Sequence, residues 1–170
     1  MTPSPSPLPI DVISDVVCPW CYIGKRRFER ALAQSGRTDV AVAWRPFQLN
    51  PDMPAEGMTR DDYVRAKFGG GDRPRQIYQA IAESGREAGI EFQFSRIRRT
   101  PNTVLSHRLV HWSAKSQEGK DGSLPPRFGN TSHGLSKELY HGAASDATVD
   151  FGIIERTLMV KRRPCDRLAL

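Results

Sequence analysis

The stretch IDVISDVVCPWC, residues 10–21, decides the fold of this chain. Residues 10–17 are rich in β-branched side chains and predict a strand. Residues 22–34 mix apolar and charged side chains and predict a helix that stops at Gly36. Residues 40–45 predict a second strand, so the chain opens as a β-α-β unit. The CPWC turn stands at the carboxyl end of the first strand, where open α/β sheets place their sites.

The two thiols of the CPWC turn are placed for redox chemistry. With Cys21 in the first turn of the helix and Cys18 just ahead of it, the sulfurs come close enough to bond to each other. Cys18 then lies beside unpaired backbone N–H groups and the positive end of the helix dipole, so we expect its pKa to be depressed. Pro19 stiffens the turn, and Trp20 offers a platform for a substrate peptide. Cys21 is the resolving thiol, which attacks the mixed disulfide formed by Cys18.

Two other interpretations of the cysteine pair are open on the residues alone. A C-x-x-C pair can be half of a zinc site, but structural zinc needs a second pair of ligands at a fitting distance. The nearest candidates, His107 and His111, stand far down the chain, and Cys165 stands alone. The pair could also be inert packing residues. We favour the redox interpretation and expect no metal.

Composition and charge restrict the class of protein. The chain has 170 residues, 38% of them apolar, and a formal net charge of +6. This length predicts one domain, or one domain with an insertion. The basic residues are spread out, so nucleic acid is not the expected partner, and Lys25–Arg27 is interpreted as a solvated helix face. Residues 1–9 are interpreted as a disordered lead rather than a secretory signal, and no stretch predicts a membrane span. A dithiol without an export signal predicts a cytoplasmic enzyme.

The middle of the chain is predicted to be mostly helical. We expect a helix over residues 61–68 with Thr59 at its N-terminus, a second over 74–88 and a third over 104–114. Residues 91–94 are predicted to be short and extended.

Three blocks of sequence together resemble one known family. They are SDVVCPWCYIGKRRFERAL, WRPFQLNPDMP and RTPNTVLSHRLVHWSA, and the resemblance covers residues 9 to about 115. The chain resembles the DsbA-like family of thioredoxin-fold oxidoreductases, and within it the FrnE-like branch. The resemblance implies an α/β fold: a thioredoxin-like β-α-β unit over residues 10–50 with a helical insertion over 51–115. It also implies dithiol–disulfide exchange with protein substrates, with Cys18 attacking and Cys21 resolving.

The rest of the chain departs from the family pattern. Residues 116–170 are polar and turn-rich at first, and the loop with a cis-proline that the family places opposite its dithiol is not found there. We therefore expect a divergent tail, a chain truncated or frame-shifted after about residue 115, and the C-terminal half of the thioredoxin sheet to be missing. A sheet without those strands has an exposed edge, which makes a homo-oligomer a reasonable expectation.

Four residues outside the turn are candidates for the site. Asp15 directly precedes the turn, and a buried carboxylate beneath a dithiol can accept the proton of the resolving thiol; a loop hydrogen bond is the alternative. His107 and His111 lie four residues apart on one helical face, where packing, a substrate groove and metal binding are the alternatives. Asn102 is expected to cap that helix. Because the resemblance places this helix near the dithiol, we group Asn102 with the two histidines as a candidate substrate groove.

These observations predict a cytoplasmic protein-disulfide oxidoreductase. Its partners are protein thiols and disulfides, or glutathione as a co-substrate, and it needs no cofactor beyond its own redox-active disulfide. One alternative comes from relatives with the same fold, the glutathione-dependent isomerases and transferases similar to 2-hydroxychromene-2-carboxylate isomerase, although these use a Ser in the equivalent turn. Another is an inactive truncated remnant that acts only as a binding module. Neither nucleic acid nor a membrane is an expected partner.

Overall fold

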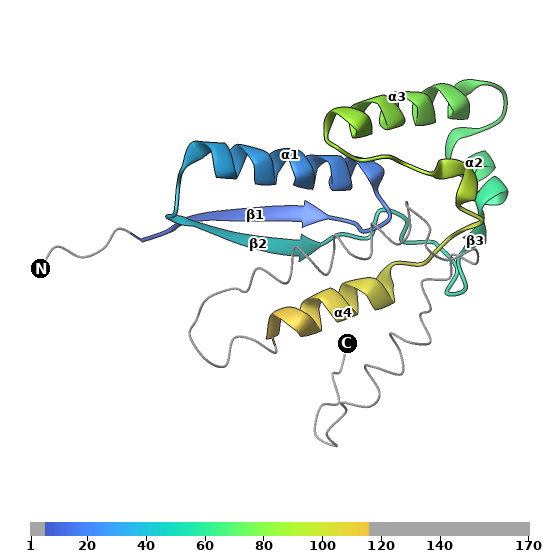
Figure 1. Cartoon of the computed structure of the whole chain (residues 1–170). Helices are drawn as coiled ribbons and strands as arrows, with labels where there is room; N and C mark the ends of the chain where they lie inside the picture. The colour runs from blue at the N-terminus through green and yellow to red at the C-terminus, as the bar shows by residue number, and fades with distance from the viewer. Residues whose placement is uncertain (1–5, 116–170) are drawn as a thin grey trace, which may run out of the picture.

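The computed structural model describes residues 6–115, which begin with a β-α-β unit. Strand β1 (Leu8–Ser14) is followed by helix α1 (Pro19–Ser35) and strand β2 (Val40–Pro46). The two strands pair in parallel along their whole lengths, as the helical crossover between them requires. Figure 1 shows α1 along one face of this sheet and the later helix α4 along the other.

The first strand starts and ends earlier than the sequence predicted. It begins at Leu8, so the expected lead over residues 1–9 is wrong for its last two residues, while residues 1–5 lie outside the described ones. It ends at Ser14 rather than at Val17, because the chain turns there. The carbonyl oxygen of Asp15 accepts the N–H of Cys18 at 3.1 Å, which closes a tight turn before the helix.

Helix α1 begins at Pro19, three residues before the predicted residue 22, and ends at Gly36 as predicted. Pro19 occupies its first turn, where the missing N–H costs nothing, and Cys18 is the N-cap residue with extended backbone angles. Gly36 ends the helix with a φ of +63°, a left-handed conformation, and its N–H bonds to the carbonyl of Ala33 at 3.4 Å.

One residue of this helix contradicts the expectation of a solvated face over Lys25–Arg27. Lys25 is buried: it forms an ion pair with Glu29, and its ammonium nitrogen lies 6.0 Å from the ring centroid of Trp44 on β2. The side chain of Arg27 is half-exposed, as expected. The methylene stem of a lysine can cover an aromatic ring while its charge is paired, a contact that a single-helix pattern does not reveal.

A helical insertion follows the second strand. Its elements are β3 (Met58–Thr59), α2 (Arg60–Phe68), α3 (Arg73–Glu87), the short 3₁₀ helix η1 (Phe94–Arg96) and β4 (Arg99–Thr100), and the chain then enters α4 (Val104–Lys115). The helices agree closely with the predicted ones. The side chain of Thr59 accepts the N–H of Asp62 at 3.2 Å, which confirms its predicted role at the start of α2.

Two short strands close the insertion and were not predicted. Strands β3 and β4 pair antiparallel, with Met58 opposite Thr100 and Thr59 opposite Arg99. Two residues are too few to show an alternating pattern, so only the tertiary contact defines these strands. Residues 91–94 are irregular or begin η1, so the extended segment predicted there forms no strand.

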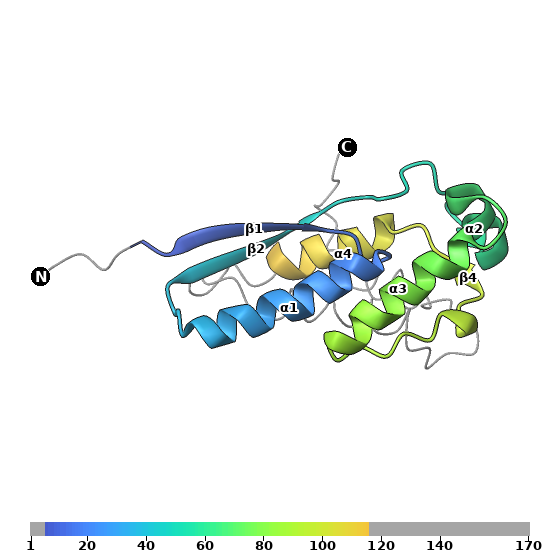
Figure 2. The same ribbon diagram turned by 90° about the horizontal axis from the view of Figure 1, so that it is seen from above.

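The core of the described residues lies where α1 meets α3. Buried side chains from the start of α1, from α3 and from the segment after it form one cluster: Val17, Tyr22, Ile23, Ile81, Ala88, Ile90 and Ile97. Aromatic rings continue the cluster toward α2, with the Phe92 ring stacked on Phe94 at 5.0 Å and in edge contact with Tyr22 at 6.0 Å. Figure 2 shows α2 and α3 gathered beyond the carboxyl ends of the strands, beside the start of α1.

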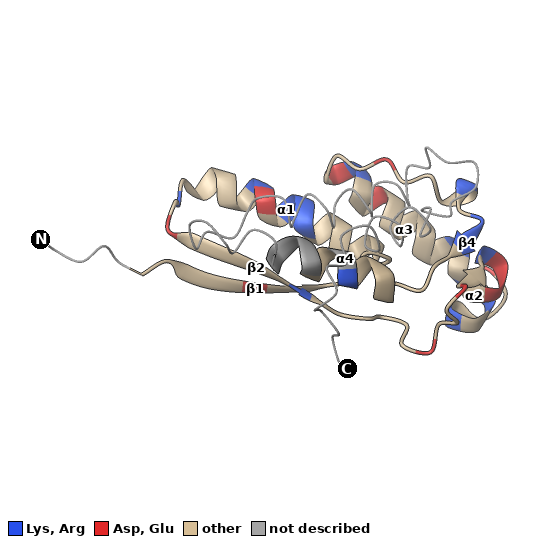
Figure 3. Cartoon of the chain, turned by 90° about the horizontal axis from the view of Figure 1, so that it is seen from below, with Lys and Arg blue, Asp and Glu red and all other residues tan. Residues whose placement is uncertain are grey.

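Charged residues of both signs are interspersed along the helices of the described part. In Figure 3, blue and red segments alternate over α1, α2 and α3. Among residues 6–115, no helix combines the length and the hydropathy that a membrane crossing requires. The expectations for the tail, the truncation and the missing half of the sheet concern residues 116–170, which lie outside the described ones.

Candidate active site

The CPWC turn has the predicted placement. Cys18 precedes the helix with φ −94° and ψ 113°, Pro19 follows at its first position, and Cys21 lies in the first turn. The carbonyl oxygen of Cys18 accepts the N–H of Tyr22 at 3.2 Å, which ties the turn to the helix. Cys18 and Cys21 are free thiols, both half-buried, and Trp20 between them is exposed.

The two thiols share a hydrogen bond, and this bond controls their acidity. It lowers the pKa of Cys21 to about 6, helped by the backbone of Asp15 and the hydroxyl of Ser14 and opposed by burial. The same bond raises the pKa of Cys18, together with burial and the charge of Cys21, against backbone N–H groups at the helix start that lower it. The first ionisation of the pair is therefore easy and the second is difficult. The depressed pKa predicted for Cys18 falls on Cys21 in this arrangement, because the helix terminus is a weaker influence than the neighbouring thiol.

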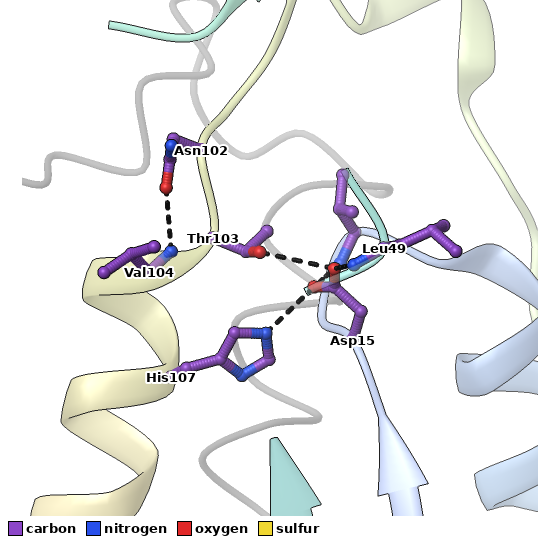
Figure 4. Close-up of polar contacts among 7 residues, drawn as sticks. Asp15, Leu49, Asn102, Thr103, Val104 and His107 are labelled. Carbon is purple, nitrogen blue, oxygen red and sulfur yellow. Dashed lines mark hydrogen bonds and ion pairs between the residues drawn. The ribbon is translucent and has the colours of Figure 1, made fainter. Parts of the chain in front are cut away.

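The carboxylate of Asp15 lies directly below the turn and is 1% exposed. Its Oδ1 accepts the N–H of Val17 at 3.3 Å, and its Oδ2 accepts the N–H of Leu49 at 2.7 Å and the hydroxyl of Thr103 at 3.3 Å (Figure 4). The charge of Asp15 is close enough to Cys21 to raise its pKa, although other influences lower the pKa more. Both interpretations of Asp15 are therefore compatible with its position, since it makes the loop hydrogen bonds and its charge also reaches Cys21.

His107 approaches the same carboxylate from α4. Its Nε2 lies 3.2 Å from Oδ1 of Asp15, an ion pair when the imidazole is protonated (Figure 4). The two atoms are close but lack the alignment of a hydrogen bond. Through Thr103 and His107, the start of α4 thus contacts the carboxylate of Asp15.

The other two members of the expected groove lie apart from the carboxylate. Asn102 caps α4 as predicted: its Oδ1 accepts the N–H of Val104 at 2.9 Å, and its Nδ2 donates to the carbonyl of Met53 at 2.7 Å. His111 is exposed one turn after His107. Asp15 and His107 are therefore brought together, whereas the substrate-groove role of His107, His111 and Asn102 stays a prediction.

A cleft of about 310 Å³ opens beside the turn, between residues 49–53 and α2. Tyr63 lies on its wall, and burial raises the pKa of this phenol, opposed by a hydrogen bond with Asn50 and by the charge of Arg60 and aided more weakly by the charges of Cys18 and Asp15. The phenol is therefore within electrostatic reach of the dithiol. At the rim, Lys67 donates to Oδ1 of Asn50 at 3.0 Å. The cleft is large enough for a small ligand or for one or two side chains of a peptide.

The structure adds residues that reasoning from the sequence did not assign. Thr103 and the backbone of Leu49 hold Asp15, Ser14 assists Cys21, and Tyr63 lies near Cys18. Leu49 stands in the block WRPFQLNPDMP and Thr103 in the block RTPNTVLSHRLVHWSA, but a block of sequence does not show which residue each position contacts. Tyr63 gave no signal, since one Tyr on a short helix is typical of packing. Within residues 6–115, no three His, Cys, Asp or Glu side chains gather in a way that could hold a metal ion.

Comparison with known proteins places this geometry in a family context. Residues 9–126 match the family of DSBA-like thioredoxin domains. The chain is 30% identical over 115 residues to the uncharacterised protein YwbO of Bacillus subtilis, a match that covers 66% of this chain and 50% of that protein. The crystal structure of a probable DsbA oxidoreductase from Streptomyces coelicolor is similar with a TM-score of 0.68 and 24% identity, covering 92% of this chain and 64% of that one. The fold is thus the predicted thioredoxin fold of DsbA-like proteins, and the chain spans half the length of its Bacillus relative.

Proposed function

This chain belongs to the family of DSBA-like thioredoxin domains, a family of oxidoreductases, and from that premise we propose that it exchanges disulfides with protein substrates through Cys18 and Cys21. The observation that carries the proposal is the hydrogen-bonded pair of thiols at the N-terminus of α1, whose first proton is lost easily. A thiolate is the reacting species in disulfide exchange, so this pair is reactive near neutral pH. We further propose the FrnE-like branch and a cytoplasmic location.

The proposed reaction has two steps. After its first ionisation the pair shares one proton; with that proton on Cys21, the Cys18 thiolate attacks one sulfur of a substrate disulfide, forming a mixed disulfide while the other substrate sulfur leaves as a thiolate and takes up a proton. Cys21 then loses its proton and attacks the Cys18 sulfur. The bond between Cys18 and the substrate breaks, the second substrate sulfur leaves as a thiolate, and the Cys18–Cys21 disulfide remains. The substrate disulfide is reduced by two electrons, and the dithiol is oxidised by two.

Asp15 is proposed as the proton acceptor in the second step. In the mixed disulfide Cys18 has no proton to share, so Cys21 loses the hydrogen bond that lowered its pKa most. A buried carboxylate next to Cys21 then offers the proton a destination. Removing that carboxylate should slow resolution more than it slows the first attack.

The exposed Trp20 and the cleft beside Tyr63 are proposed to receive the substrate. Trp20 offers a broad apolar surface next to Cys18, and the cleft begins at Leu49, whose N–H bonds to Asp15. The volume of the cleft also favours a second candidate function, in which a small thiol such as glutathione is the co-substrate of an isomerase or transferase reaction. A conjugation assay with glutathione and an electrophile separates this candidate from protein-disulfide exchange.

Insulin reduction tests the proposal directly. The wild-type chain is expected to accelerate reduction of insulin by dithiothreitol, and Cys18→Ser is expected to reduce this rate to background. Cys21→Ser is expected to accumulate the mixed disulfide, because the resolving thiol is missing. Equal rates for the wild type and Cys18→Ser would reject the exchange reaction and favour a binding module.

The acidity of the thiols gives a second test. Below its pKa a thiol is protonated and alkylates slowly, and above it the thiolate reacts. The rate of alkylation by iodoacetamide is therefore expected to rise as the pH passes through about 6, the pKa of Cys21 in the pair. Replacing either cysteine by Ser removes the shared thiol bond, so the remaining thiol is expected to titrate elsewhere. A profile that matches free cysteine in the wild type would contradict the paired thiols.

A further inference from the structure

Among the described residues, four groups contact the Asp15 carboxylate, and one of them is chemically different from the rest. The N–H groups of Val17 and Leu49 are backbone donors, and Thr103 contributes a hydroxyl. None of these three groups takes up a proton near neutral pH. The fourth contact is the Nε2 atom of His107, 3.2 Å from Oδ1, and an imidazole both accepts and releases protons in this pH range (Figure 4).

Burial makes this difference important. Asp15 is 1% exposed, so water does not reach it freely, whereas the side chain of His107 is 12% exposed. His107 also lines a small recess beside the carboxyl end of β2, together with Ser14, Trp44 and Arg45. The imidazole therefore connects the buried carboxylate with the outside of the described fold.

Several other titratable or charged groups face this pair. Cys21 on α1 feels the charge of Asp15, Tyr63 on α2 has its pKa raised by burial and further by that charge, and Arg45 of β2 lies on the same recess as His107. Arg45 is itself paired with Asp11 at 3.1 Å, which reduces its influence on the recess. Of these groups, the imidazole of His107 is the one in contact with an Asp15 oxygen.

We propose that His107 is a positioning residue that acts through Asp15 and transfers the proton of the resolving thiol to solvent. This inference rests on the proposed function. As Cys21 attacks Cys18, the Cys21 proton moves to the Asp15 carboxylate and the Cys21 electron pair forms the new S–S bond. The bond between Cys18 and the substrate breaks, and the substrate leaves as a thiolate. The proton then passes from Oδ1 of Asp15 to Nε2 of His107 and from the imidazole to water, which restores the carboxylate.

Ellman's reagent separates the two steps in one experiment. Attack by Cys18 releases one thionitrobenzoate and leaves the other on Cys18, and resolution by Cys21 releases the second. His107→Gln is expected to leave the first phase unchanged and to slow the second about tenfold, less than the roughly 10²–10⁴-fold of direct acid–base catalysis, because the imidazole acts through Asp15. Asp15→Asn is expected to slow the second phase at least as much, and the double variant no more than Asp15→Asn alone. Arg108→Gln, an exposed position on the same helix, is the matched control and should match the wild type.

A rescue experiment separates proton transfer from support of the structure. His107→Ala should be slow in the second phase and should recover as imidazole is added at constant pH. Pyrazole has a ring of the same size but is a much weaker base, so it should not restore the rate. Equal rescue by both compounds, or a second phase in His107→Gln as fast as in the wild type, would overturn the role of His107.

The outcomes also separate this inference from the proposed function. If the wild type releases no second thionitrobenzoate, the dithiol does not close a disulfide, and the exchange reaction fails together with the role of His107. If the wild type releases both and His107→Gln does the same at an equal rate, exchange stands and the role of His107 alone is rejected.

Discussion

The residues below the dithiol turn and the strand that leads into it differ sharply in burial. Asp15 and Ile23 of α1 are each 1% exposed, whereas on β1 Leu8 is 44% exposed and Ile13 is 66% exposed. The dithiol turn stands on the buried residues. Its position is therefore fixed by contacts between the start of α1 and the helical insertion, and much less by the strands that lead into it.

The contacts of the buried residues come from distant parts of the sequence. Ile23 belongs to the cluster that also contains Ile81 of α3 and Ile90 of the following segment. Asp15 is held from residues 49, 103 and 107. The helical insertion thus does more than cover the site, since it supplies four of the seven buried residues in the core cluster.

The largest expected effect separates the buried residues from the exposed strand directly. Ile23→Ala removes a fully buried side chain and leaves a cavity, so we expect a loss of about 3 kcal/mol in the free energy of unfolding. Ile13→Ala is the matched substitution on the exposed strand, where we expect a change within about 0.5 kcal/mol. Urea unfolding followed by circular dichroism measures both. Equal losses at the two positions would mean that the strand is as well packed as the core, which would break the comparison.

Two helical glycines, Gly85 and Gly24, allow a closely packed position to be compared with an open one. A Cβ on Gly85 of α3 would lie 2.6 Å from two carbons of the Phe92 ring, which is itself stacked on Phe94. Overpacking of this kind costs about 2 kcal/mol, and the better helix propensity of Ala returns about 1 kcal/mol. We therefore expect Gly85→Ala to lower the free energy of unfolding by about 1 kcal/mol.

Gly24 of α1 is the matched control for that substitution. It is exposed, and a Cβ there meets nothing within 4 Å. Gly24→Ala should therefore stabilise the chain by about 1 kcal/mol through helix propensity alone. If both glycine variants gained stability, the close packing of α3 against Phe92 would be contradicted.

Local patterns in the sequence were sufficient for the elements and for the dithiol turn. The β-branched runs, the prolines and the helix-ending Gly36 depend on neighbouring residues, so the β-α-β unit and the position of Cys18 and Cys21 could be predicted from them. The same holds for Thr59, whose capping bond joins residues three apart. Periodicity and capping are local properties that a single sequence displays.

The features that were missed depend on residues far apart in the chain. The burial of Lys25 requires Trp44, and the surroundings of Asp15 require Thr103 and His107. The direction of the pKa shifts at the dithiol depends on which thiol receives the hydrogen bond of the other, and the helix terminus alone predicts the opposite assignment. No period or spacing encodes such contacts, so they appear only in the fold.

The insertion and the site should also unfold together, and the cap of α2 tests this. Thr59→Ala removes the oxygen that accepts the N–H of Asp62, so we expect a loss of about 1 kcal/mol in the free energy of unfolding. Thr59→Ser keeps the hydroxyl and should retain most of the stability. Circular dichroism and the exposure of Cys18 to a thiol reagent should report the same urea midpoint in both variants. Separate midpoints would mean that the insertion opens without the site.

The smallest expected effect concerns an exposed contact between α1 and α3. Arg27 pairs with Glu87 at 2.8 Å, and both side chains are exposed. Because water and salt screen such pairs, Arg27→Gln should change the free energy of unfolding by less than about 0.5 kcal/mol, and the change should shrink further in 1 M salt, where screening acts within about 3 Å. A double-mutant cycle with Glu87→Gln measures the coupling. The buried apolar cluster between α1 and α3 predicts that apolar packing, and not this ion pair, holds the two helices together. A coupling free energy as large as that of a buried ion pair, and unaffected by salt, would mean that the contact between α1 and α3 depends on charge.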